Sequence, residues 1–256
     1  MTHSWAARWF GRGLGFLFAL FLLPHSRAVS APQGVLVPSY FYPGKYWTQA
    51  SATTPKAGQI LILNPNSGPG KTFDKNYAAT ALAARNGGST VLGYVHTTYG
   101  DRDVAAVLAE IEKFREWYQV DGIFLDEAAS DVLDVPYYQT VADAIHELDN
   151  SLLIVLNPGT HPAEAYMQIA DIIVTTETSF ERYKLKKVPS WVYKYPANRF
   201  CHIVFAAADT SQMAQALAIS RQRNAGFVYV TDDVWANPYD RLPKYWTSLI
   251  SGVNLP

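Results

Sequence analysis

The feature that most constrains this fold is a regular alternation of short apolar runs with helix-like segments between residues 34 and 251. Most of the runs are continuously apolar rather than alternating, which is typical of strands that helices cover on the outside. The runs predict eight strands, at residues 34–41, 59–64, 90–96, 121–126, 152–157, 171–176, 202–207 and 226–231.

The segments between these runs predict helices. In 103–118 the apolar residues recur at spacings of three and four, and an aspartate at 101 or 103 can cap the first turn. The predicted helices cover residues 77–85, 103–118, 137–148, 162–170, 211–224 and 239–251, whereas 180–200 is the least regular segment. Eight strand–helix units in a chain of this length favour a single α/β domain, a (β/α)8 TIM barrel, over an open doubly wound sheet.

The first 31 residues have a different character and are set apart from the fold. They contain no acid, and two arginines precede an apolar run at 13–23 that ends at a proline and is followed by small residues. This order predicts a cleavable signal peptide at 1–31 and a mature domain at 32–256. The run is shorter than the roughly 20 residues of a membrane-spanning helix, so we expect a secreted or periplasmic protein. A retained N-terminal anchor is the alternative.

Composition narrows the partners of the mature domain. A formal net charge of −1 gives no electrostatic signature for nucleic acid or an anionic membrane. The 14% aromatic content fits a well-packed core, and it also fits a carbohydrate cleft in which sugar rings stack on aromatic faces. Cys201 is the single cysteine and cannot form an internal disulfide, so we expect it to be buried. We expect a monomer.

Active sites of (β/α)8 barrels lie at the carboxyl ends of the strands. Three of the predicted strands end in carboxylates: Asp126 and Glu127 after the fourth, Glu177 after the sixth, and Asp232 after the eighth. Polar and aromatic side chains stand at the other exits. The residues predicted to bind substrate are Tyr40, Asn64, His96, Tyr99, Asn157, Asp232 and Trp235.

The acids suit glycosidic cleavage, which needs two carboxyl groups flanking one bond. Asp126 and Glu127 are adjacent and would face opposite sides of a regular strand, but both can turn into the cleft where the pleat ends. Glu127 and Glu177 are predicted as the acid and the nucleophile or base, in either order. Asp126 would tune its neighbour's pKa or hold the substrate. Retaining and inverting outcomes both stay open.

Competing chemistries lack their motifs in this chain. There is no HExxH, no Cys/His cluster at metal spacing and no GxSxG, so no metal or cofactor is expected. Two alternatives remain: a non-catalytic polysaccharide-binding barrel, and a barrel lyase or aldolase. The latter usually uses a metal or a Schiff-base lysine at a strand exit, whereas Lys71 and Lys184 fall in loops.

Five segments together resemble the spherulin-4 family of glycoside hydrolases. They occur in collinear order as VPSYFYP (37–43), ILNPNSGPG (62–70), GYVHTTYG (93–100), DGIFLDE (121–127) and NPG (157–159). The resemblance implies a (β/α)8 barrel and endo-hydrolysis of α-1,4-linked N-acetylgalactosamine in microbial exopolysaccharides, such as galactosaminogalactan in biofilm matrix. Related barrels act on partly deacetylated, Pel-type polymers.

The resemblance also implies that Asp126 and Glu127 are the family's acidic pair and that Glu177 is its further glutamate. One departure accompanies the last assignment. The family often has an aromatic residue directly before that glutamate, whereas Thr175 and Thr176 precede Glu177 here. Glu181 is the alternative for this position.

Overall fold

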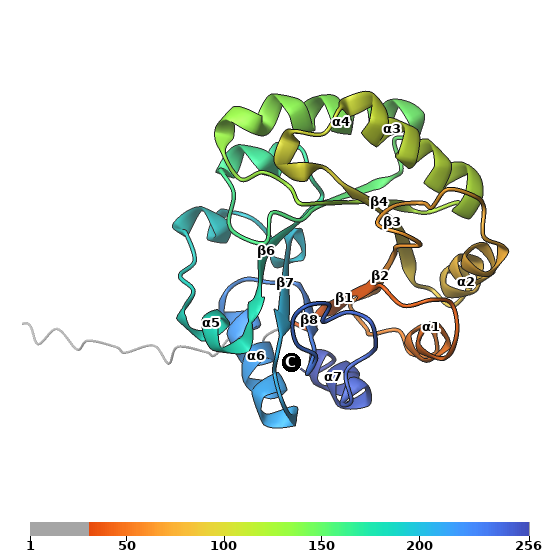
Figure 1. The fold of residues 1–256 in the computed structure, drawn as a ribbon. Coiled ribbons are helices and arrows are strands. Elements are labelled where there is room, and N and C mark those ends of the chain that lie inside the picture. The colour runs from red at the N-terminus through yellow and green to blue at the C-terminus, as the bar shows by residue number, and fades with distance from the viewer. Residues whose placement is uncertain (1–30, 256) are drawn as a thin grey trace, which may run out of the picture.

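Eight parallel strands pair in chain order within residues 31–255, the part of the chain that the computed structural model describes. The eighth strand pairs with the first, Gly34 opposite Phe227 and Val35 opposite Val228, so the sheet closes into a barrel (Figure 1). The predicted (β/α)8 barrel is therefore confirmed. The strands are β1 (Gly34–Ser39), β2 (Gln59–Leu63), β3 (Thr90–His96), β4 (Gly122–Asp126), β5 (Leu153–Leu156), β6 (Ile172–Ser179), β7 (Phe200–Phe205) and β8 (Phe227–Val230).

Helices surround the barrel and cover its outer face (Figure 1). Each connection must carry the chain from the carboxyl end of one strand back to the amino end of the next, because parallel neighbours cannot be joined by a hairpin. The helices are α1 (Lys45–Ser51), α2 (Lys75–Asn86), α3 (Val104–Lys113), α4 (Val135–Leu148), α5 (Phe180–Leu185), α6 (Thr210–Gln222) and α7 (Trp246–Val253).

The helix predicted at 103–118 forms for the reasons that the sequence indicated. Asp103 is the N-cap, and its side chain accepts a hydrogen bond from the Ala106 N–H at 3.0 Å. Val107 and Ile111 turn inward and are fully buried. The helix continues as a π-helical turn, Phe114–Tyr118, and ends at Gln119, whose backbone is left-handed.

Two predicted helices are wrong in extent. Residues 162–170 form only a 3₁₀ segment, Glu164–Gln168, and the Arg199 guanidinium caps the free carbonyls of Met167 and Ala170 where the chain turns into β6. The last helix begins at Trp246 rather than 239, since Pro243 disfavours helical backbone in the residue before it. Helices α1 and α5 were not predicted.

Strand β6 is longer than predicted, and this matters for the site. It continues to Ser179, and its register against β7 shifts between Val174 and Thr176. The shift is a β-bulge that inserts Thr175 as an extra residue. Glu177 therefore lies within the strand, opposite Ile203, and not in a loop beyond it.

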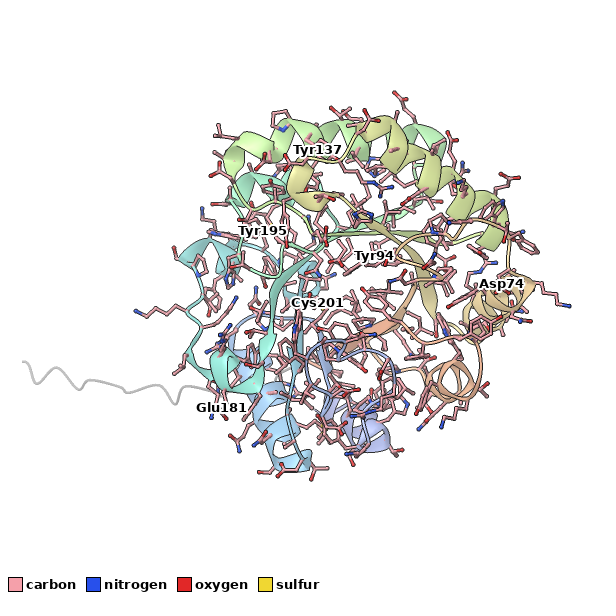
Figure 2. All side chains as sticks on the ribbon, viewed as in Figure 1. Asp74, Tyr94, Tyr137, Glu181, Tyr195 and Cys201 are labelled. Atoms are coloured by element: carbon pink, nitrogen blue, oxygen red, sulfur yellow. The ribbon has the colours of Figure 1, made fainter. Side chains whose placement is uncertain are left out.

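Side chains fill the interior of the barrel. Figure 2 shows Tyr94 and Cys201 directed toward its middle, whereas Glu181 lies at the periphery on α5. Cys201 is fully buried as predicted, and burial raises the pKa of its thiol. The signal peptide predicted at 1–31 falls almost wholly outside the described residues. Between residues 31 and 255, no helix is long and apolar enough to cross a membrane.

The start of β4 predicts a stability effect. A Cβ on Gly122 would collide with the backbone oxygen and nitrogen of Leu153 on β5, which pairing holds in place. We expect Gly122→Ala to lower the free energy of unfolding by about 1–3 kcal/mol or more, measured by urea denaturation. Gly44→Ala is the control, since its nearest contact would be 3.8 Å away, and we expect it to cost less than about 1 kcal/mol. Equal losses in both variants would contradict this account.

Candidate active site

A cleft of about 800 Å³ opens at the carboxyl ends of the barrel strands. Loops and strand ends from β3 to β8 contribute to it, and all three predicted catalytic acids lie in its wall. The lining residues are Tyr99, Asp126, Glu127, Asn157, Pro158, Gly159, Glu177, Thr178, Ser179, Arg182, Phe205 and Trp235.

The exit of β4 turns both of its acids into this cleft. Glu127 has a left-handed backbone with φ of 49°, which breaks the alternation that would send neighbouring side chains to opposite faces. Thr97 fixes the turn, because its hydroxyl donates to the carbonyls of Asp126 and Glu127 at 3.1 and 3.0 Å. The Tyr99 N–H adds a third bond, to the Glu127 carbonyl at 2.7 Å. The adjacent carboxylates therefore share one cavity.

Asn157, at the end of β5, joins the acids of β4 and β6. Its side-chain Nδ2 donates to Asp126 Oδ1 and to Glu177 Oε2, each at 2.7 Å. Its Oδ1 accepts the Gly159 N–H at 3.0 Å, which fixes the orientation of the amide. The Glu177 N–H in turn donates to the Gly159 carbonyl at 3.0 Å. One side chain thus sets the spacing of two carboxyl groups that come from different strands.

Tyrosines supply further donors below the acids. The Tyr239 hydroxyl donates to Glu177 Oε1 at 2.6 Å, and the Tyr94 hydroxyl donates to Asp126. Tyr40 lies between them, edge-to-face with the ring of Tyr94 at 5.4 Å and with that of Tyr239 at 5.6 Å. Three tyrosines therefore pack behind the acids, and the hydroxyl of Tyr239 binds one of the carboxylates directly.

This environment raises the pKa values of two acids. Burial raises the pKa of Asp126, while hydrogen bonds from Tyr94, the Glu127 backbone and Asn157 oppose the rise. For Glu177, burial and then the negative charge of Asp126 raise the pKa, while hydrogen bonds from Tyr239 and Asn157 lower it. The charge of Asp126 thus favours a proton on Glu177, as expected for two close carboxyl groups with separate roles.

Glu127 occupies a more open position. Its side chain is 43% exposed, and its Oε2 lies 3.8 Å from Nδ1 of His96. The same nitrogen is 3.2 Å from the Thr98 hydroxyl. His96 therefore lies beside Glu127 and is not one of the residues that line the cleft.

Aromatic and cationic side chains form the walls. Trp235 and Tyr99 are 77% and 62% exposed although both line the cleft, and Trp235 lies 6.3 Å from the ring of Phe205. Exposed aromatic faces beside paired acids suit the stacking of sugar rings. Arg182 adds a positive charge to the wall beside β6.

Two residues predicted to bind substrate lie outside the cleft lining and contact other parts of the chain. The Asn64 side chain accepts the Gly68 N–H at 3.1 Å and so shapes the loop after β2. The Asp232 side chain is only 3% exposed, and its oxygens are occupied by Arg241 and Lys244. Both predictions assumed that a polar side chain at a strand exit is available to substrate, whereas these two side chains bind groups of the neighbouring loops. The alternative Glu181 lies outside the cleft, where it pairs with Lys184.

Tyr94 and Tyr239 were missed by the sequence reasoning. Tyr94 carried a usable signal, because it lies two residues before His96 on one strand and therefore shares its face. Tyr239 carried none, since it follows β8 by nine residues and the sequence placed it at the start of the last predicted helix. Between residues 31 and 255, no group of three His, Cys, Asp or Glu side chains is placed to hold a metal ion.

A closed (β/α)8 barrel with paired carboxylates at the carboxyl ends of its strands has the architecture of the barrel glycosidases. The crystal structure of Aspergillus clavatus Sph3 in complex with GalNAc superposes with a TM-score of 0.75 and 22% identity, covering 88% of this chain and 99% of that one. The noncanonic maltogenic α-amylase AmyB from Thermotoga neapolitana gives a TM-score of 0.52 and 10% identity, over 86% of this chain and 75% of that one.

Sequence comparison identifies the family. Residues 34–253 match spherulation-specific family 4, the spherulin-4 family. Spherulin-4 of Physarum polycephalum is 33% identical over 265 residues, which covers 93% of this chain and 78% of that protein. The chain belongs to the spherulin-4 family, as the sequence resemblance indicated.

The Asn157 bridge can be tested directly. Asn157→Leu keeps the approximate volume but removes the donor that stabilises both ionised acids, so we expect the pKa values of Asp126 and Glu177 to rise by about half a unit or more. Carbon-13 NMR titration of the carboxyl groups measures both. Asn64→Leu is the matched control and should leave them in place. Unchanged values in Asn157→Leu would show that the bridge has no electrostatic effect.

Proposed function

We propose that this protein is a glycoside hydrolase in which Asp126 is the nucleophile and Glu177 is the acid and base. The observation that carries the proposal is the pair of hydrogen bonds from Asn157. Both acceptor oxygens lie 2.7 Å from one nitrogen, and ideal trigonal geometry at the amide corresponds to a separation of about 4.7 Å between them. Retaining glycosidases hold their two carboxyl groups about 5–5.5 Å apart, whereas inverting enzymes leave about 6.5–9.5 Å for a water.

The contacts of the two acids support this division of roles. Asp126 accepts a hydrogen bond from Asn157 at 2.7 Å, and Tyr94 and the Glu127 backbone also lower its pKa, so its ionised form is favoured, as a nucleophile requires. Glu177 has its pKa raised by burial and by the Asp126 charge, so it holds a proton when Asp126 has lost its own. Glu127, which the sequence suggested as a partner of Glu177, lies further out beside His96 and is assigned to substrate binding.

The reaction then proceeds in two displacements. Asp126 Oδ attacks the anomeric carbon while Glu177 gives its proton to the departing glycosidic oxygen, which leaves a glycosyl ester on Asp126. Glu177 next takes a proton from water, the water oxygen attacks the same carbon, and the ester bond breaks to release Asp126. Activity therefore rises with pH as Asp126 ionises and falls as Glu177 loses its proton.

We infer that the substrate is an exopolysaccharide of α-1,4-linked N-acetylgalactosamine, cleaved internally. Family membership supports this class of substrate, and the GalNAc bound to Sph3 agrees with it. In an α-linked residue the acetamido group lies on the same face as the leaving oxygen and cannot attack from behind. An enzyme carboxylate must then serve as nucleophile, which fits the pair of Asp126 and Glu177.

The assay incubates purified residues 32–256 with an N-acetylgalactosamine-rich exopolysaccharide. We expect the wild type to release soluble oligosaccharides that carry the α-anomer when first formed, observed by proton NMR. Asp126→Asn and Glu177→Gln should each lose more than about 1000-fold in rate, because each removes one of two obligatory groups. Glu127→Gln should retain more activity than either and lose it mainly through KM.

Other outcomes point to other functions. Tight retention on the polymer without release of oligosaccharides would favour a non-catalytic binding barrel. A β-anomeric first product would exclude the retaining mechanism while leaving the hydrolase in place.

We further propose that the protein is exported and acts as a monomer in the periplasm or outside the cell. The acid-free, apolar character of residues 1–31 supports export. Expression of the full chain in a secreting host should yield a mature protein that begins near residue 32, as determined by N-terminal sequencing. A purified protein that still begins at Met1 and sediments with membranes would favour the retained anchor instead.

A further inference from the structure

An ion pair joins the two ends of the loop after β8, residues 231–244: Arg241 binds both Asp232 and Asp233. Arg241 Nη1 and Nη2 donate to Asp232 Oδ1 and Oδ2 at 3.0 and 3.2 Å, and its Nε lies 3.0 Å from Asp233 Oδ2. The backbone N–H of Lys244 donates to the same Asp232 carboxylate at 3.0 Å. Every donor nitrogen of the guanidinium is therefore used, in the bidentate geometry that arginine forms best with carboxylates.

The closed segment carries one residue that lines the cleft and one that binds a cleft acid. Trp235 lies on the wall, and Tyr239, two positions before Arg241, donates to Glu177. Tyr239 reaches the acid from outside the strands, so the path of the loop decides where its hydroxyl lies.

The acidic end of the loop is fixed to the barrel. The Asp233 carbonyl accepts the Ala206 N–H at 2.7 Å, and the Ala207 N–H donates to the Thr231 carbonyl at 3.0 Å. These bonds tie residues 231–233 to the exit of β7. Arg241 transmits this fixed position to the far end of the loop, since its side chain contacts both Asp232 and Asp233, whereas the Lys244 side chain contacts Asp232 alone.

We propose that Arg241 is a positioning residue for Glu177: by holding Asp232 and Asp233, it keeps the Tyr239 hydroxyl on that acid and Trp235 on the cleft wall. The inference rests on the proposed role of Glu177. It also gives Asp232 a function in place of the predicted contact with substrate.

The direction of the effect follows from the hydrogen bond. Tyr239 lowers the pKa of Glu177 by stabilising the carboxylate, so releasing the loop raises that pKa and moves the alkaline limb of the activity profile to higher pH. The ionisable groups whose charges act on or from Glu177 are Asp126, Tyr40, Tyr94, Tyr239 and Cys201. Those that act on or from Arg241 are Asp232, Asp233, Asp240, Tyr229 and Tyr245.

Arg241→Gln releases the loop and also removes a positive charge, and either effect would raise the pKa of Glu177. Asp232→Ala separates these two effects. Removing the negative charge of Asp232 would by itself lower the pKa of Glu177 and move the limb to lower pH. Releasing the loop moves it to higher pH. Positioning therefore predicts the same sign for Asp232→Ala and Arg241→Gln, whereas a through-space charge effect predicts opposite signs.

The test measures kcat and KM against pH on the exopolysaccharide. We expect Arg241→Gln and Asp232→Ala to move the alkaline limb upward by about 0.5 pH unit, as Tyr239→Phe does, with KM increased by the loss of the Trp235 wall. Arg241→Gln combined with Tyr239→Phe should show no further displacement, and Arg241→Lys should restore part of it. Arg221→Gln is the control, since that arginine binds the carbonyls of Gly252 and Leu255 and should leave the limb in place.

A limb that stays at the wild-type pH in Arg241→Gln, or shifts of opposite sign in Arg241→Gln and Asp232→Ala, would overturn the proposal. Additive shifts in the double variant would also overturn it. If the wild type releases no oligosaccharide, the hydrolase fails, but the positioning is still measured by carbon-13 NMR titration of Glu177 in the same variants. An unchanged Glu177 pKa there would overturn the positioning role by itself.

Discussion

Closure of the parallel sheet is the constraint from which the site follows. Because β8 pairs with β1 in the same direction as every other neighbour, all eight carboxyl ends meet at one face of the barrel. Closure of the barrel alone therefore brings together residues that are far apart in the chain. Asp126 ends β4, Asn157 directly follows β5, and Glu177 lies within β6. A single amide can reach both acids because β5 lies between β4 and β6.

The sequence predicts the parts of this arrangement that depend on strand exits. Continuous apolar runs give all eight strands, and Asp126 and Glu127 directly follow such a run. Glu177 is placed near the correct exit, but the bulge at Thr175 is invisible because it arises from pairing with β7. From the sequence alone, a carboxylate at a strand exit that faces substrate cannot be distinguished from one that pairs with an arginine nine positions further on. That ambiguity is why Asp232 was assigned to substrate binding.

The site divides into a rigid part and a looped part. The carboxylates and Asn157 belong to strand ends, where the register of neighbouring strands fixes their spacing. Tyr239 and Trp235 belong to one loop, whose position depends on the pairing of Arg241 with Asp232 and Asp233. Chemistry that needs fixed distances is thus carried by the sheet. The hydrogen bond to Glu177 and the exposed face of Trp235 are carried by the loop.

The raised pKa values of Asp126 and Glu177 make the stability of the protein depend on pH. A carboxyl group whose pKa is higher in the folded chain binds its proton more tightly there than in the unfolded chain. Asp126 and Glu177 are both of this kind, so the protein loses stability as pH rises from the ordinary carboxyl pKa through their raised values. Their donors, Asn157 and the two tyrosines, limit that loss because each favours an ionised acid. The same hydrogen bonds that orient the acids therefore also reduce the energetic cost of placing two carboxylates side by side in a barrel.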